Sequence, residues 1–218
     1  PDDLFMREFV TTLLPSIQFS DTPISPSCPE TISDGLLDAR TSIQSEFGFA
    51  LFNRFDTNLR DRLINAERFW RSCKDGHDAL VFVCDLYAAL QIAFRNSLTG
   101  LLPPDIRESE YVGTAQEKAK ACGLGVLPDC LLTVKRNAIR ETLLGNDQTL
   151  QSCFIAFLLV SDSERLIAIA QIQPTLVPDV ARLIEARGHG NQPSPMSKSD
   201  IHNLRKSAYT IVKTLMEV

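Results

Sequence analysis

The chain has 218 residues, 44% of them hydrophobic and 22% charged, which is the composition of a globular protein and excludes a disordered chain. Its net charge of −5 argues against a broad surface that coats nucleic acid, since such a surface needs excess lysine and arginine. The length suits one large domain or two small ones, and because the chain begins with Pro1 we expect it to be part of a longer protein.

The first half of the chain shows helical patterns separated by breaks. Residues 2–14 have apolar side chains at helical spacing, and a linker rich in proline and serine follows at 15–30. Helix is expected over about 31–74, with an interruption near Gly48. Residues 79–98 then predict a long, strongly apolar central helix.

The second half is expected to continue as helices. A weaker pattern covers about 107–121, and the segment 129–145 opens after Pro128 and stops at Gly145, as a helix should. The apolar run within 146–162 also fits a buried strand. We favour a helix there because the neighbouring segments are helical.

Capping residues mark the later helices. Asn146 and Asp147 are expected to open one helix, and a short helix should run over about 176–187. Ser197 and Asp200 then form a capping-box-like start for the last helix. This helix carries a single apolar stripe, formed by Ile201, Leu204, Ala208, Ile211, Val212 and Leu215. The chain is therefore predicted to be all-α, a multi-helix bundle.

The cysteines and the known motifs exclude several kinds of site. None of the six cysteines forms a C-x-x-C pair, so a zinc site has little support. Several lie in apolar helical patterns such as VFVCDLY, which favours buried, reduced thiols. No P-loop, dinucleotide fingerprint or H-E-x-x-H motif occurs, and the longest apolar run, FIAFLLV (154–160), is too short to span a membrane. We expect a cytoplasmic protein without metal or cofactor that binds no membrane.

The stretch RLIEARGHGN (182–191) carries the residues best suited to chemistry. Histidine exchanges protons near neutral pH, and a guanidinium binds phosphate and stabilises charge on it. Arg182 and His189 are therefore candidate catalytic residues for RNA cleavage without a metal ion. The neighbouring Arg187 and Asn191 are candidate substrate-binding residues.

Two further residues could line an RNA groove. His202 lies one turn into the last predicted helix, and Arg205 follows it by three residues. Both are candidate substrate-binding residues, and the alternative is that they belong to a solvated helix face.

The last third of the chain, from about 146 to 218, resembles the end of a HEPN domain. The motif of that family is arginine, four to six residues, then histidine, between the last two long helices; RLIEARGH supplies Arg182 and His189 at the upper spacing. Leu183 stands where the family usually has a polar residue. The resemblance implies a HEPN-like helical bundle over 104–218, with 1–103 as an N-terminal helical region or as part of the same bundle.

The same resemblance implies a function. Many HEPN domains are ribonucleases of anti-phage defence and toxin–antitoxin systems, and they often act as homodimers. The chain is thus expected to be a metal-independent endoribonuclease effector domain of a larger prokaryotic protein. Two copies of Arg182 and His189 would cleave RNA at a dimer cleft and leave a 2′,3′-cyclic phosphate.

A non-catalytic interpretation stands beside this one. Gly188 and Gly190 are good helix-stop residues, and Arg182 and Arg187 complement the dipole at a helix C-terminus. Many HEPN-like domains lack activity. The alternative is a helical dimerisation or partner-docking domain, whose partners are a second copy, other domains of a longer chain, or another protein.

Overall fold

The computed structural model describes residues 30–72, 76–146, 149–188 and 197–218. The chain divides into two compact units, Pro1–Ser33 and Asp34–Val218. About 80% of the described residues are helical and none of them lies in a strand, so the predicted all-α fold is confirmed. The division predicted at residues 103 and 104 stays a prediction.

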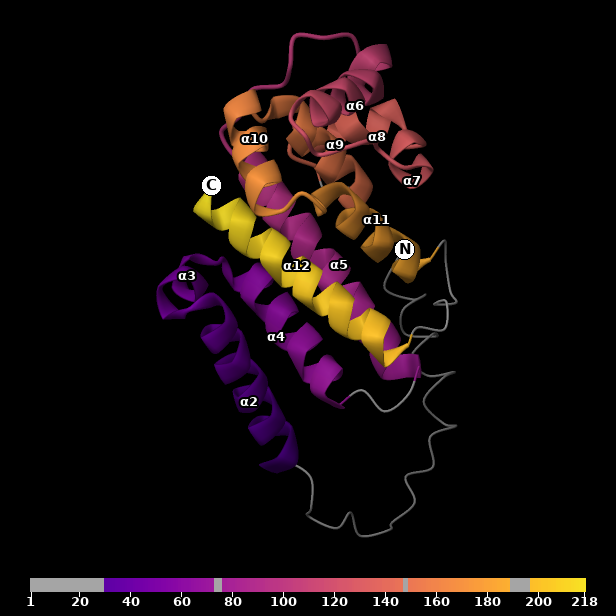
Figure 1. Cartoon of the computed structure of the whole chain (residues 1–218). Coiled ribbons are helices and arrows are strands. Elements are labelled where there is room, and N and C mark those ends of the chain that lie inside the picture. Colours follow the sequence, from indigo (N-terminus) through magenta and orange to yellow (C-terminus); the bar gives the residue numbers. More distant parts are fainter. Residues whose placement is uncertain (1–29, 73–75, 147–148, 189–196) are drawn as a thin grey trace, which may run out of the picture. The chain divides into compact units, whose positions relative to one another are not determined.

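The described residues form eleven α-helices, labelled in Figure 1 where there is room. The first are α2 (Glu30–Phe47), α3 (Phe49–Arg54), α4 (Thr57–Ser72), α5 (Gly76–Leu98) and α6 (Tyr111–Ala121), which follows a 3-10 turn, η2 (Glu108–Glu110). The others are α7 (Asp129–Leu132), α8 (Arg136–Leu143), α9 (Leu150–Val160), α10 (Ser163–Ile172), α11 (Leu176–Arg187) and α12 (Lys198–Glu217).

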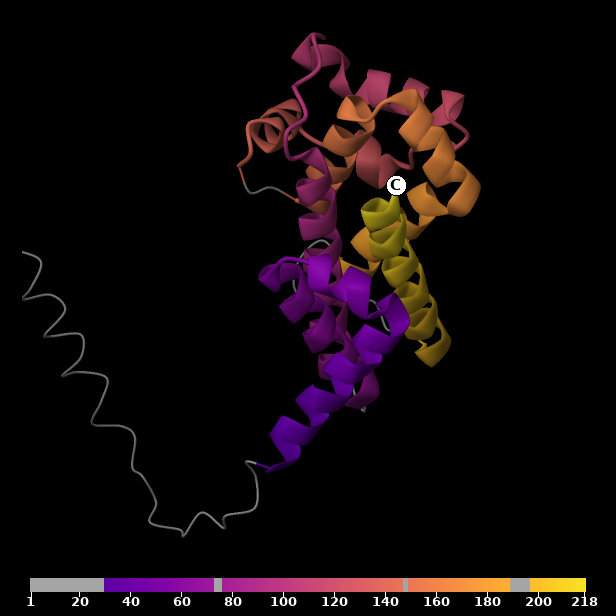
Figure 2. The same cartoon turned by 90° about the vertical axis from the view of Figure 1, so that its left-hand side faces the viewer.

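Helix α5 is the centre of the packing. It contacts α4, α9, α11 and α12, and in both views α4 and α12 lie along it while α6 to α9 gather at one end (Figures 1 and 2). Phe94 of α5 is fully buried between Phe154 and Phe157 of α9, with ring centroids 5.1 and 5.3 Å apart. Tightly packed aromatic pairs of this kind contribute beyond their buried area.

One stretch of the described residues, Ala79–Leu98 in α5, is long and apolar enough to cross a membrane by composition alone. Half of this stretch is buried within the bundle. The core helix of a globular domain shows the same combination of length, hydropathy and burial.

Helix α9 settles the choice between strand and helix at 146–162. It is apolar on every side and almost completely buried, as expected for a helix surrounded by others. The predicted start at Asn146 is wrong, because α9 begins at Leu150 and the side chain of Asn146 donates to Glu141. Asp147, the other predicted capping residue, lies outside the described residues. Thr149 is the N-cap, and its hydroxyl accepts a hydrogen bond from the N–H of Ser152.

Two breaks in the helices differ in how well the sequence predicted them. The interruption at Gly48 is confirmed: its φ of 78° lies in the left-handed region that favours glycine. The single helix predicted over 129–145 is wrong. Lys135 is extended, with φ −67° and ψ 133°, and it divides the segment into α7 and α8.

The four described cysteines are free thiols. Cys122 and Cys153 are buried as predicted and Cys130 is half-buried, but Cys84 is exposed. The inward face of α5 is formed at helical spacing by residues such as Val83 and Leu86, which leaves Cys84 on the opposite face.

A buried carboxylate joins three helices. Glu67 of α4 is fully buried. Its oxygens accept hydrogen bonds from Arg205 Nε at 2.7 Å, Tyr209 Oη at 3.0 Å and Ser42 Oγ at 2.7 Å. Arg71 donates a further bond at 3.1 Å. The network ties α4 to α12 and α2 and satisfies a charge that would otherwise be costly to bury.

Candidate functional site

The two helices that flank the predicted motif both have well-defined ends at this point of the chain. Helix α11 ends at Arg187, followed by Gly188 with φ 72°. Helix α12 begins with the predicted capping box: the Ser197 hydroxyl accepts from the Asp200 N–H, and the Asp200 carboxylate accepts from the Ser197 N–H. A hydrogen bond from the Ser197 hydroxyl to the Asp200 carboxylate, and then the bond from the Ser197 N–H, keep the pKa of Asp200 below its usual range.

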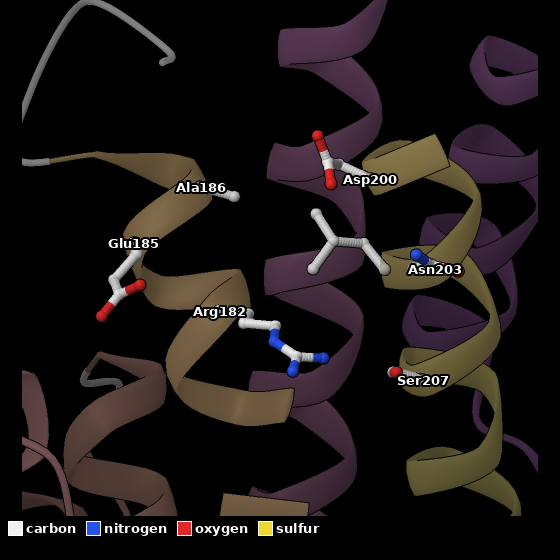
Figure 3. A pocket seen from close by; sticks show the side chains of 7 residues that line it. Arg182, Glu185, Ala186, Asp200, Asn203 and Ser207 are labelled. Carbon is white, nitrogen blue, oxygen red and sulfur yellow. The ribbon is translucent and has the colours of Figure 1, made fainter. Parts of the chain in front are cut away.

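An open groove lies between α11 and α12 (Figure 3). It has a volume of about 560 Å³ and is termed the α11–α12 groove here. The side chains around it come from both helices; they are Arg182, Glu185, Ala186, Asp200, Asn203, Leu204 and Ser207. The groove thus lies between the last two long helices. In the sequence, the interval that contains the predicted His189 connects these two helices.

Arg182 is both held and accessible. Its guanidinium donates to Asp179 at 3.3 Å, its side chain is 64% exposed, and it points from α11 toward α12 (Figure 3). Asp179 is buried and also accepts from Thr175 Oγ1 at 2.8 Å and Gln173 Nε2 at 3.2 Å. Because Thr175 and Gln173 fix this carboxylate, it orients the Arg182 side chain while the guanidinium keeps unused donors.

His189 and Asn191 lie outside the described residues. Arg187 is described, and its guanidinium lies over the ring of Tyr87, 4.0 Å from the centroid. Such a cation–π contact occupies one face of the guanidinium. Arg187 is not among the residues that line the α11–α12 groove.

Tyr87 anchors the end of α11 to the core. Its buried hydroxyl accepts from the Leu150 N–H at 3.0 Å and donates to Gln151 Oε1 at 2.7 Å. Burial raises the pKa of Tyr87, and the Leu150 N–H and the Arg187 guanidinium oppose the rise. The tyrosine therefore connects α5, α9 and α11 as a neutral hydroxyl.

Tyr87→Phe is expected to lower the free energy of unfolding by about 1–2 kcal/mol, because it leaves the buried Leu150 N–H without its acceptor. Urea denaturation followed by circular dichroism at 222 nm measures this. The phenylalanine ring keeps the contact with Arg187, so an unchanged midpoint would show that the hydroxyl contributes nothing.

Arg205 is held inside the bundle and does not line the groove. Its side chain is 11% exposed, and it bonds Glu67 and lies 3.5 Å from Glu46. Its guanidinium also lies 4.3 Å from the centroid of the Trp70 ring. His202 is exposed, with its ring centroid 6.3 Å from that of Trp70. The structure therefore places His202 and Arg205 together on the Trp70 side of α12, apart from Arg182.

Sequence reasoning missed the acidic residues of the site. Asp179 follows Pro178 in the first turn of α11, where a carboxylate favours the helix dipole, and this position was the available signal. Glu185 and Asp200 reach the groove from different helices, so no local spacing reveals them. Within the described ranges, no three histidine, cysteine or acidic side chains gather as metal ligands do.

Comparison with known protein families, curated proteins and solved structures found no match to the chain.

Proposed function

We propose that the chain is a metal-independent endoribonuclease domain, the effector part of a larger prokaryotic defence or toxin protein. The observation that carries the proposal is the position of Arg182: a largely exposed guanidinium in an open groove between the last two long helices. His189 follows it after six residues, the spacing of the HEPN motif. RNA offers the phosphate that such a guanidinium binds best.

In the proposed reaction the 2′-hydroxyl of RNA attacks the adjacent phosphorus. The 2′-O–P bond forms, the bond from phosphorus to the 5′-oxygen breaks, and the products are a 2′,3′-cyclic phosphate and a 5′-hydroxyl. His189 moves the proton, as base toward the 2′-hydroxyl or as acid toward the leaving oxygen. Arg182, oriented by Asp179, holds the negative charge on the phosphate. In a homodimer, the two copies of His189 would take the two proton-transfer roles.

Incubation of the chain with RNA in excess EDTA tests the proposal. We expect cleavage products that end in a 2′,3′-cyclic phosphate, because no step needs a metal ion. His189→Ala serves as the control for a contaminating nuclease. Equal cleavage by the variant, or no cleavage by either protein at high concentration, would contradict the proposal.

A second candidate, a non-catalytic docking domain, is favoured by the charges around Arg182. Glu185 and Asp200 line the same groove, so their carboxylates outnumber its cation and oppose the approach of a polyanion. Arg187 and Arg205 are engaged by Tyr87 and Glu67. A docking domain would show no cleavage in EDTA and would bind RNA no better than an acidic control protein does.

A further inference from the structure

A second groove lies against α11. It has a volume of about 520 Å³ and is bounded by the 124–128 segment and by the start of α11. Most of its lining is apolar, formed by Leu124, Val126, Pro128, Val177, Pro178 and Ala181. We term it the proline-lined groove. It shares Arg182 and Glu185 with the α11–α12 groove, so these two residues stand where the grooves adjoin.

Glu185 supplies the carboxylate of the proline-lined groove. Its carboxylate points away from α12, opposite to the direction of Arg182 (Figure 3). It is exposed and has no hydrogen bond or ion pair with the side chains that the structure describes. On this side lies Cys130 of α7; burial and then the charge of Glu185 raise the pKa of its thiol. Among the described residues no donor occupies either carboxylate oxygen of Glu185, so both can accept from a ligand.

We propose that the proline-lined groove binds a guanine base of an RNA whose phosphate is held by Arg182, an inference that rests on the proposed ribonuclease function. Unpaired bases are recognised by packing on their faces and by hydrogen bonds to their edges. The prolines and Val126, which is 63% exposed, offer apolar surface for a base face. Glu185 would contact the base edge, and Arg182, which points toward the other side of α11, would hold a phosphate of the same RNA strand.

The carboxylate selects guanine among the four bases. Guanine presents two adjacent donors, N1–H and N2–H, which match the two oxygens of a carboxylate. Adenine and cytosine present one amino donor next to a bare ring nitrogen, and that nitrogen repels a carboxylate oxygen. Uracil presents one N–H between two carbonyl oxygens. Only guanine therefore satisfies both oxygens of Glu185 without repulsion.

Binding to short RNAs tests the inference. Fluorescein-labelled heptanucleotides of uridine, with guanosine, adenosine or uridine at the central position, are titrated with the full chain carrying His189→Ala, which prevents cleavage. We expect the guanosine RNA to bind about tenfold more tightly than the uridine RNA. Adding Glu185→Gln should reduce that ratio to about one, because an amide offers a single acceptor. Glu117→Gln, a change at an exposed glutamate of α6, should leave the ratio unchanged.

The outcomes separate this inference from the proposed function. Arg182→Ala should weaken all three RNAs by a similar factor and keep the guanosine preference. A guanosine preference that survives Glu185→Gln would overturn the guanine site but not the proposed ribonuclease function. Equal binding of the three RNAs by a chain that cleaves RNA would do the same. No binding of any RNA, together with no cleavage in EDTA, would overturn the proposed function and this inference with it.

Discussion

Arg182→Ala is expected to lower the rate of RNA cleavage by about 10²–10³-fold, the usual loss when one group that stabilises charge in the transition state is removed. The guanidinium is the cation of the α11–α12 groove, and Asp179 fixes its direction. Single-turnover cleavage of a labelled RNA in EDTA, at saturating protein, measures the loss in the chemical step. Arg182→Lys should recover only part of the rate, because an ammonium ion lacks the forked geometry of arginine.

The matched control is Arg136→Ala, which removes an exposed arginine at the start of α8. It should change the cleavage rate less than about twofold, since Arg136 does not line the α11–α12 groove. Thermal denaturation of both variants checks the fold. The Arg182 side chain is 64% exposed and its ion pair to Asp179 is worth at most about 1 kcal/mol, so both proteins should stay folded. A folded Arg182→Ala variant with full activity would contradict the assignment of Arg182.

Glu67→Gln is expected to have the largest effect on stability, a loss of about 3–5 kcal/mol in the free energy of unfolding. The variant leaves Arg205, 11% exposed, without the carboxylate 2.7 Å from its Nε. In addition, the glutamine carries an NH₂ group where Glu67 has an acceptor oxygen. This donor would face the hydroxyls and guanidiniums that donate to Glu67 in the wild type. Urea denaturation followed by circular dichroism at 222 nm gives the free energy. A loss below about 1 kcal/mol would show that the network contributes little.

Acid should remove the same stabilisation from the wild-type chain. Burial alone raises the pKa of Glu67, but hydrogen bonds from Arg205, Ser42 and Arg71 and the charge of Arg205 lower it below its ordinary value of 4.5. A carboxylate with a depressed pKa stabilises the fold above its unfolded pKa and loses this contribution as pH falls through its folded pKa. Stability should therefore fall less steeply below pH 4.5 in Glu67→Gln than in the wild type.

The control for both measurements is Glu108→Gln. Glu108 pairs with Arg140 at 3.3 Å, and the two side chains are 44% and 54% exposed. Exposed pairs contribute about 0–1 kcal/mol, so this variant should resemble the wild type in stability and in its response to acid. A loss as large as that of Glu67→Gln would mean that burial does not explain the difference.

Local signals predicted the elements of the fold that depend on local physics. The interruption at Gly48 and the capping box at Ser197 and Asp200 each need only a few neighbouring residues, and both are confirmed. The extended backbone at Lys135 was not predicted, because the capping signals at both ends of 129–145 gave no reason for a break within it. The pattern of apolar and capping residues does not predict a single extended residue inside a helical segment.

The site was less accessible to sequence reasoning because its contacts join distant segments. Glu185 of α11 and Asp200 of α12 line one groove, and no pattern in either helix reveals that they meet there. Arg182 was found because its motif is contiguous with His189. The predicted roles of His189 and Asn191 stay predictions, since both residues lie outside the described part of the chain.

The ends of α11 and α12 are each held by contacts within the described part of the chain. The chain leaves α11 beside Arg187, which is held on Tyr87, and enters α12 through the hydrogen bonds of Ser197 and Asp200. Both anchors are made of residues that the structure describes, so each helix end is fixed by its own neighbours. Each wall of the α11–α12 groove is thus held in place separately, by Tyr87 at the end of α11 and by the capping box at the start of α12.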